Sequence, residues 1–285
     1  MHSRVSGAFL DCGRFRIDLS RPRVMAIINV TPDSFSGDGL PDPARAIERA
    51  LRSIEEGADI LDIGGESTRP GARPVSPAEE IDRVIPVLEA LRGAGVPLSA
   101  DTRHTEVMRA AIDAGADLIN DVAALREPGA LDALAGSRCA VCLMHMRGEP
   151  ATMQESPRYD DAVREVRAFL SERAQAARRA GIDAGRILVD PGFGFGKRLE
   201  DNVALLKRLA EIADIGYPVL AGISRKSMLG ALTGRPVGER LAASVAAALI
   251  AAERGARVLR VHDVAATRDA LAVLDAMDTG REDGG

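Results

Sequence analysis

The chain has 285 residues, of which 46% are hydrophobic and 28% charged, and its formal net charge is −5. This composition is typical of a globular protein, and the length fits one α/β barrel as well as two smaller domains. The charge balance argues against nucleic acid or a membrane surface as partner. The N-terminus lacks the apolar core of a signal peptide, and the longest apolar run, residues 241–252, is too short to span a membrane. We therefore expect a cytoplasmic protein.

The predicted elements begin with a small hairpin over about residues 8–20, which turns at Cys12-Gly13. Short apolar runs then alternate with longer helical patterns. Eight strands are expected at 24–30, 58–64, 97–101, 117–122, 139–145, 186–192, 218–224 and 257–263. The clearest helices between them are 44–57, 77–93, 105–115 and 159–181, each ending in a glycine that is a common helix stop (Gly57, Gly93, Gly115 and Gly181).

Eight strand–helix units predict an α/β fold, a closed (β/α)8 TIM barrel over about residues 24–277. We expect the hairpin to cover the bottom of this barrel. The sequence contains no linker or low-complexity segment, so residues 1–285 are expected to form a single domain.

Cys139 and Cys142 form a C-x-x-C, and His145 follows three residues later. That spacing occurs in redox and zinc sites. However, the run 139–145 resembles a buried strand, in which positions three apart point to opposite faces, and a second pair of ligands is lacking. We interpret the run as a strand, and the three cysteines of the chain as thiols of a reducing compartment.

Polar side chains stand at or near the end of every predicted strand. In a barrel these ends meet at the catalytic face. A polar residue after a strand can also cap a backbone turn, and Asp121 suits that role. The whole set nevertheless predicts a site at one mouth of the barrel; it comprises Asn29, Asp62, Asp101, Asn120, Asp121, His145, Asp190, Ser224, Arg225, Arg260 and His262.

The loop DPGFGFGK, residues 190–197, looks at first like a phosphate loop. It is neither the G-x-x-x-x-G-K-[ST] nor the G-x-G-x-x-G pattern, because its glycines are spaced by two and Arg198 follows the lysine. We expect the glycines to allow a tight turn beside Asp190, with Phe193 and Phe195 as a flat wall for a ring; packing of the loop is the alternative. A carboxylate beside an aromatic wall suits a heterocycle with adjacent N–H groups, such as a pterin or guanine edge.

Eight motifs, taken together, closely resemble those of the dihydropteroate synthase family. They occur in this order between about Val24 and Val264: INVTPDSFSGDG, DIGGESTRPGA, SADT, NDV, CLMHM, DPGFGFGK, GISRKSMLG and RVHDV. The resemblance implies condensation of 6-hydroxymethyl-7,8-dihydropterin pyrophosphate with p-aminobenzoate, with Mg²⁺, to give dihydropteroate and pyrophosphate. It also implies a homodimer and sulfonamides as competitive ligands.

The resemblance assigns a role to particular residues of this chain. The catalytic group comprises Asp101, Lys226, Arg260 and His262. The pterin site comprises Asp101, Asn120, Met144, Asp190, Phe195, Lys226 and Arg260. The pyrophosphate site comprises Asn29, Thr68, Arg69, Arg260 and His262. The p-aminobenzoate site comprises Phe35, Thr68, Arg69, Pro70 and Ser224.

These residue types suit a reaction whose barrier lies in the departure of pyrophosphate. The arylamine is already neutral at pH 7, so a general base gains little before attack. Mg²⁺, Arg260 and His262 can stabilise charge that develops on the leaving group. We therefore expect departure before attack.

One loop departs from the family pattern. The family usually has D-S-F-S-D-G-G, whereas residues 33–39 here are D-S-F-S-G-D-G. The acid is displaced by one position, but the flanking Gly37 and Gly39 can let Asp38 swing back toward the ion. We expect Asp38 and Asn29 to be Mg²⁺ ligands; the alternative is that Asp38 is a solvated turn residue.

Three alternatives remain at this point. A pterin-dependent methyltransferase would share the fold but not RVHDV, STRPG and SRKS. A barrel aldolase would use Lys226 as a Schiff-base lysine but leaves DPGFGFGK unexplained. A non-catalytic paralogue would bind pterin without turnover.

Overall fold

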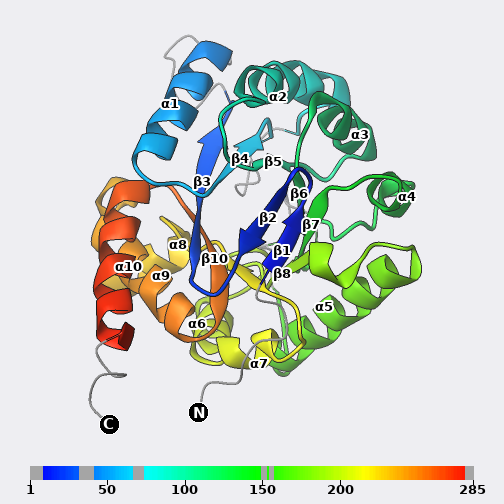
Figure 1. The fold of residues 1–285 in the computed structure, drawn as a ribbon. Coiled ribbons are helices and arrows are strands. Elements are labelled where there is room, and N and C mark those ends of the chain that lie inside the picture. Colours follow the sequence, from blue (N-terminus) through cyan, green and yellow to red (C-terminus); the bar gives the residue numbers. More distant parts are fainter. Residues whose placement is uncertain (1–8, 32–41, 67–73, 149–152, 154–156, 280–285) are drawn as a thin grey trace.

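The computed structural model describes residues 9–31, 42–66, 74–148, 153 and 157–279 (Figure 1). Eight parallel strands form a closed barrel in the order β10-β3-β4-β5-β6-β7-β8-β9, which confirms the predicted TIM barrel. Their bounds are β3 Arg23–Asn29, β4 Ile60–Gly64, β5 Leu98–Asp101, β6 Leu118–Asp121, β7 Ala140–Met144, β8 Ile187–Asp190, β9 Val219–Ala221 and β10 Ala256–Val261. Each of the eight overlaps one of the predicted runs.

Helices surround the barrel (Figure 1). Several begin at a side chain that accepts from the first free backbone N–H groups, as Asp42, Ser76 and Asp161 do for α1, α2 and α5. The α-helices are α1 Pro43–Glu55, α2 Pro77–Leu91, α3 Thr105–Ala114, α4 Ala130–Ala135, α5 Ala162–Arg179, α6 Leu199–Lys207, α7 Leu209–Ala213, α8 Ser227–Thr233, α9 Leu241–Glu253 and α10 Val264–Thr279. Two short 3₁₀ turns, η2 Ala184–Arg186 and η3 Val237–Glu239, complete the described helical elements.

The predicted glycine stops hold for three of the four helices. Gly57, Gly115 and Gly181 follow α1, α3 and α5 with φ of +96°, +99° and +96°. Gly93 also follows its helix by two residues but lacks the left-handed conformation, because α2 ends at Leu91 with Arg92 as its right-handed cap and the residue with positive φ is Gly95. The left-handed glycine after α2 therefore comes two residues later than the sequence suggested.

A two-stranded hairpin, β1 Phe9–Cys12 and β2 Phe15–Asp18, lies across the barrel centre in Figure 1. Cys12 pairs with Phe15, so the turn residues are Gly13 and Arg14, one later than predicted. Apolar hairpin side chains pack with residues near the start of the barrel strands, among them Met25, Ile60 and Leu118. The hairpin therefore covers the N-terminal end of the barrel, as predicted, and leaves the carboxyl ends of the strands for the site.

The two cysteines of the C-x-x-C face different layers, as predicted. Cys142 packs inside the barrel with the hairpin, and Cys139 packs in the layer between strands and helices. Burial raises the pKa of both thiols, that of Cys139 to about 11. Neither is a reactive thiolate at neutral pH.

None of the described helices is both long enough and apolar enough for a transmembrane span.

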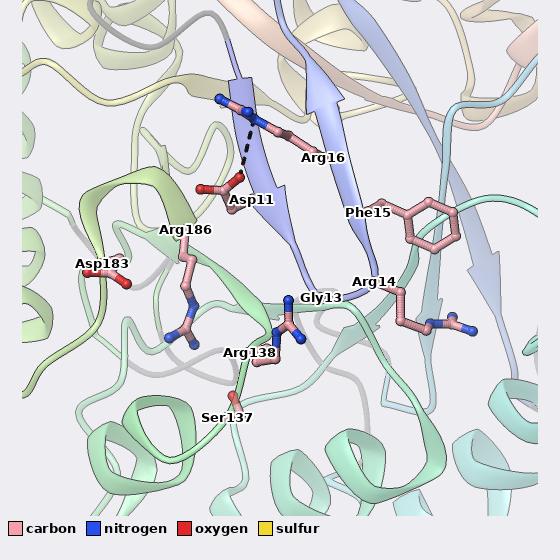
Figure 2. Close-up of a pocket in the computed structure, with 9 residues that line it drawn as sticks. All are labelled: Asp11, Gly13, Arg14, Phe15, Arg16, Ser137, Arg138, Asp183 and Arg186. Carbon is pink, nitrogen blue, oxygen red and sulfur yellow. Dashed lines mark ion pairs between the residues drawn. The ribbon is translucent and has the colours of Figure 1, made fainter.

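An open cavity of about 510 Å³ lies beside the hairpin, at the covered end of the barrel. Figure 2 shows its lining residues: Asp11, Gly13, Arg14, Phe15, Arg16, Ser137, Arg138, Asp183 and Arg186. Three of its arginines are already engaged, since Arg14 pairs with Asp117, Arg16 with Asp11, and Arg186 donates to backbone carbonyls. The cavity is remote from the polar strand ends, so we do not assign it to catalysis.

Candidate active site

A guanidinium held by two carboxylates lies at the centre of the barrel mouth. Arg260 of β10 donates from Nε to Asp62 Oδ2 at 2.5 Å and from Nη2 to Asp101 Oδ2 at 2.6 Å. Asp62, fully buried on β4, also accepts from Ser99 Oγ at 2.5 Å and from Asn120 Nδ2 at 3.1 Å. Four strands, β4, β5, β6 and β10, are thereby joined through one network of charged and polar groups.

Burial and neighbouring charges shift the pKa values of Arg260 and Asp101 in this network. Burial lowers the pKa of Arg260, but Asp62 and Asp101 outweigh it, so that the pKa is raised and the guanidinium stays charged. Burial raises the pKa of Asp101, with Arg260 opposing and Asp62 adding to the rise. The two carboxylates share one cation. Their hydrogen bonds to Nε and Nη2 fix the plane of the guanidinium.

The glycine loop after β8 turns tightly for a steric reason. Gly192, Gly194 and Gly196 all have positive φ, between +60° and +81°. A Cβ on Gly192 would lie 2.0 Å from His145 O, and one on Gly196 would lie 2.3 Å from Arg147 O. The predicted tight turn beside Asp190 is confirmed, and the alternate spacing of the glycines follows from these close approaches.

A buried lysine holds this loop from the inside. Lys197 Nζ contacts His145 Nδ1 at 2.9 Å and donates to the carbonyls of Gly192 at 2.8 Å, Phe195 at 3.0 Å and His145 at 3.2 Å. Burial, followed by the charge of Lys197, lowers the pKa of His145 to about 2, so its neutral Nδ1 serves as an acceptor. Lys197 and His145 therefore build the loop; His145 does not join the Arg260 network, although it follows a strand.

Lys226, at the start of α8, reaches the same loop from the outside. Its Nζ donates to Phe193 O and lies 4.4 Å from the centroid of the Phe195 ring. The side chain passes Gly194, where a Cβ would lie 3.2 Å from Lys226 Cδ. Burial lowers the pKa of Lys226 to about 8, with Asp190 opposing. The amine is thus mostly protonated at pH 7, and it loses its proton within about one to two pH units above that.

Asp190 ends β8 with 5% of its surface exposed. Its Oδ1 accepts from Gly192 N at 2.7 Å, and burial raises its pKa while Lys226 opposes the rise. Nearby, Phe195 packs against an apolar cluster that consists of Val122, Met144, Met146 and Met153. Met144 and Phe195 therefore belong to one apolar cluster, and their role as a wall for the pterin ring stays a prediction. Phe193 lies outside this cluster: it is fully buried in the layer under the helices, so the packing alternative is correct for it.

His262 follows β10 and contacts Ser224, which follows β9. The Nδ1 of His262 lies 3.0 Å from Ser224 Oγ, and its backbone N donates to the same oxygen at 3.2 Å. Ser224 is buried, so its hydroxyl orients the imidazole. Arg225 beside it has a φ of +57° and pairs with Asp263, which ties the SRK and RVHD motifs together.

The remaining predicted site residues lie in different places in the chain. Asn29 ends β3, half-buried, and its Cα neighbour on β4 is Gly64. Asp121 accepts from the backbone N of Ala123 and of Leu125, so it closes a turn, as the capping alternative predicted. Five predicted site residues lie outside the described residues: Phe35, Asp38, Thr68, Arg69 and Pro70.

The part that Asp62 plays in the network was not predicted. The sequence places this residue near a strand end, but no motif gives it a function of its own. The signal that could have revealed it is a carboxylate inside an apolar run, ILDIG, because a charge buried in a strand needs a partner across the barrel.

The chain is similar in sequence and in fold to known proteins. Residues 25–262 match the family described as pterin binding enzyme. A dihydropteroate synthase of Neisseria meningitidis serogroup B is 52% identical over 93% of this chain and 96% of its own. A solved Xanthomonas albilineans dihydropteroate synthase with 4-aminobenzoic acid has a TM-score of 0.90 and 57% identity, over 95% of this chain and 98% of that one. A Yersinia pestis dihydropteroate synthase in a sulfonamide drug complex has a TM-score of 0.91 and 48% identity, over 95% and 99%.

Proposed function

Because the chain belongs to the pterin-binding enzymes, alongside relatives named dihydropteroate synthase, we propose that it condenses 6-hydroxymethyl-7,8-dihydropterin pyrophosphate with p-aminobenzoate. The products are 7,8-dihydropteroate and pyrophosphate. The observation that carries the proposal is the fixed guanidinium of Arg260, which is held by Asp62 and Asp101 at the barrel mouth where the glycine loop and Lys226 also lie. A cation held in this way suits a reaction in which an anion leaves.

The pterin end of the substrate fits the side formed by β6 to β8. Asp190 can accept two parallel N–H bonds from the ring N–H and the exocyclic amine, and the ring can lie against Phe195 and Met144. Lys226 can donate to the pterin carbonyl, and Asp101 and Asn120 add polar contacts at the opposite edge. This assignment uses buried groups whose geometry is already set, so that little ordering is needed on binding.

The reaction then proceeds by departure and capture. The bond between the pterin methylene carbon and the pyrophosphate oxygen breaks, and its electron pair leaves with pyrophosphate. Arg260 and His262 stabilise that developing negative charge, and the pterin ring nitrogens delocalise the positive charge left on carbon. The arylamine nitrogen forms the new C–N bond with its lone pair and then releases a proton to water.

The p-aminobenzoate end involves Phe35, Thr68, Arg69 and Pro70 together with Ser224. In this proposal, Ser224 acts mainly through His262, whose imidazole it orients. Sulfonamides carry the same aniline group, so they compete for this end of the site. The 4-aminobenzoic acid and sulfonamide complexes of the two solved relatives support this part of the proposal.

Mg²⁺ is the cofactor that we propose, and the described residues fit it in part. Asn29 offers a neutral oxygen at the mouth, half-buried at the end of β3. Mg²⁺ typically takes one or two protein oxygens and fills the rest of its octahedron with water and substrate phosphate. When bound, the ion neutralises charge on the pyrophosphate. Asp38 is the second protein ligand in this proposal.

The direct test of the function uses the purified enzyme. Titration calorimetry with the pterin pyrophosphate, in the presence of Mg²⁺, should show saturable binding. Addition of p-aminobenzoate should then yield dihydropteroate and pyrophosphate in equal amounts. Binding without product would instead support the non-catalytic paralogue, and transfer of a methyl group would support the methyltransferase alternative. A single domain, a homodimer and a cytoplasmic location stay predictions.

The affinity for the pterin should depend on pH through Lys226. Its pKa of about 8 lies below the ordinary value, so the ammonium loses its proton as the pH rises through 8. The hydrogen bond to the pterin carbonyl then loses its charge assistance, and affinity should fall by up to about tenfold per pH unit above that point. Calorimetry between about pH 6.5 and 9.5 measures this fall. Lys226→Met should bind weakly with a flat profile; a wild-type profile that is equally flat would contradict the assignment.

Mg²⁺ dependence tests the displaced loop acid. Asp38→Ala and Asn29→Ala should each raise the Mg²⁺ concentration for half-maximal turnover by at least about tenfold, because each removes an oxygen ligand. Asp33→Ala, in the same loop, is the matched control and should leave the requirement close to that of wild type. If Asp38→Ala behaves like this control, Asp38 is a solvated turn residue and the loop closes by another contact.

A further inference from the structure

Outside the residues assigned above, one cluster combines two carboxylates and an imidazole. Glu66 follows β4, Glu80 lies on α2 and His104 follows β5. One ligand atom from each lies within 4.8 Å of the others. Three separate segments of the chain therefore bring metal-ligating groups to one point beside the barrel mouth.

Two members of this cluster carry buried polar atoms that lack a well-placed hydrogen-bond partner among the described residues. Glu80 is 0% exposed, and neither of its carboxyl oxygens meets a donor in good hydrogen-bond geometry within the described part of the chain, although the Thr102 side chain lies near enough to favour the charged form. The Nε2 of His104 is also buried and unpartnered there. A buried carboxylate without a donor costs several kcal/mol, so this arrangement persists only if a proton or a cation compensates it. Burial raises the pKa of Glu80 to about 8, so a proton shared with His104 is the competing occupant of this cluster, and the test below separates the two.

The imidazole is also oriented as a metal ligand would be. His104 Nδ1 lies 3.4 Å from Glu127 Oε1, and Glu127 is itself held by the backbone N of Thr105. A proton on Nδ1 that is directed to Glu127 leaves a free lone pair on the buried Nε2, the nitrogen that we assign to the cluster with Glu66 and Glu80. Metal-ligating histidines almost always have such an outer carboxylate or carbonyl partner. The contact with Glu127 thus orients the imidazole and favours the tautomer that has its proton on Nδ1.

We propose that Glu66, Glu80 and His104 bind a divalent cation of the Zn²⁺ class, at a site separate from the Mg²⁺ of the reaction. One nitrogen and two carboxylate oxygens suit Zn²⁺, whereas Mg²⁺ prefers oxygen ligands alone. Ligand distances near 2.0–2.2 Å require the three atoms to move together by roughly 1 Å. Arg103, which pairs with Glu66 at 3.2 Å, shares that carboxylate with the ion.

The position of the site indicates a structural role for the ion. Glu66, just after β4, also accepts from the backbone N of Val75, just before α2, at 3.3 Å. An ion held by Glu66, Glu80 and His104 would link the end of β4 to α2 and to the segment that follows β5. We expect the bound ion to raise the thermal midpoint of the chain without any substrate present.

The test uses chelator-treated, full-length enzyme without pterin or pyrophosphate. Titration with Co²⁺, followed by its visible absorption, and then displacement by Zn²⁺ should show one equivalent bound; excess Mg²⁺ should not displace it. His104→Gln and Glu80→Gln should each weaken binding at least about a hundredfold, since even outer-shell changes cost ten- to a hundredfold. Glu106→Gln, an exposed carboxylate two residues after His104, is the matched control and should bind like wild type.

Two outcomes would overturn the proposal. One is the lack of saturable Co²⁺ or Zn²⁺ binding by the wild type, and the other is binding that His104→Gln and Glu80→Gln leave undiminished. Because Glu80→Gln keeps the size of the side chain and removes a buried charge, the metal-free variant should fold at least as well as wild type. A thermal midpoint that rises with Zn²⁺ in the wild type but not in this variant separates metal binding from a merely protonated carboxyl.

Discussion

Arg260→Ala should lower turnover by about a hundred- to a thousandfold, the usual cost of removing a group that stabilises charge only in the transition state. The KM for p-aminobenzoate should change little, because the guanidinium acts on the leaving pyrophosphate in our proposal. Steady-state rates of pyrophosphate release, measured with each substrate varied in turn, give both values. Unchanged turnover with a raised KM for p-aminobenzoate would show that Arg260 is misplaced.

The network around Arg260 requires a control for structure. Removal of the guanidinium leaves Asp62 buried opposite Asp101 with no cation between them, so the variant is expected to lose stability as well as activity. Arg260→Lys retains the charge but cannot donate to both carboxylates in one plane. It should unfold in urea closer to the wild type and still turn over at least about tenfold slower. Turnover restored fully by lysine would mean that charge alone, and not its fixed placement, is required.

The sequence was informative about the barrel because each strand and helix has its own local signal. Eight apolar runs and the glycines after α1, α3 and α5 define the alternation, and parallel strands bring their carboxyl ends to one mouth. For that reason the sequence alone predicts that Asp101, Asn120, Asp190 and Arg260 lie near the site. The turn of the hairpin was one residue off because Cys12 still pairs with Phe15.

The division of labour within the site was harder to predict, since it depends on contacts between distant segments. Lys197 and His145 are 52 residues apart and of reactive types, yet burial together makes them part of the scaffold. Phe193 and Phe195 differ by two residues, and only the path of the glycine loop decides which one enters the core. Asp62 was visible as an acid in an apolar strand, but its partner Arg260 lies 198 residues further along the chain.

Asp190→Asn should weaken pterin binding by roughly 2–4 kcal/mol, which corresponds to about a thirty- to a thousandfold rise in Kd. The asparagine keeps the acceptor for Gly192 N but presents an NH₂ group to the pterin, so that donor faces donor. It also removes the carboxylate that opposes the loss of the Lys226 proton. Calorimetry at about pH 6.5, the lower end of the range used for Lys226, measures the affinity with this second effect reduced.

Asp121→Asn is the matched control for this change. Asp121, like Asp190, is a buried carboxylate at the end of a barrel strand, but both of its oxygens accept from backbone N–H groups of the following turn. Its replacement should lower the free energy of unfolding and leave pterin affinity within about threefold of wild type, because the lost bond lies within the protein. If Asp190→Asn also binds pterin within threefold of wild type, the carboxylate of Asp190 does not hold the pterin edge. The ring would then have to be recognised through Asp101 and Asn120 on the other side of the mouth.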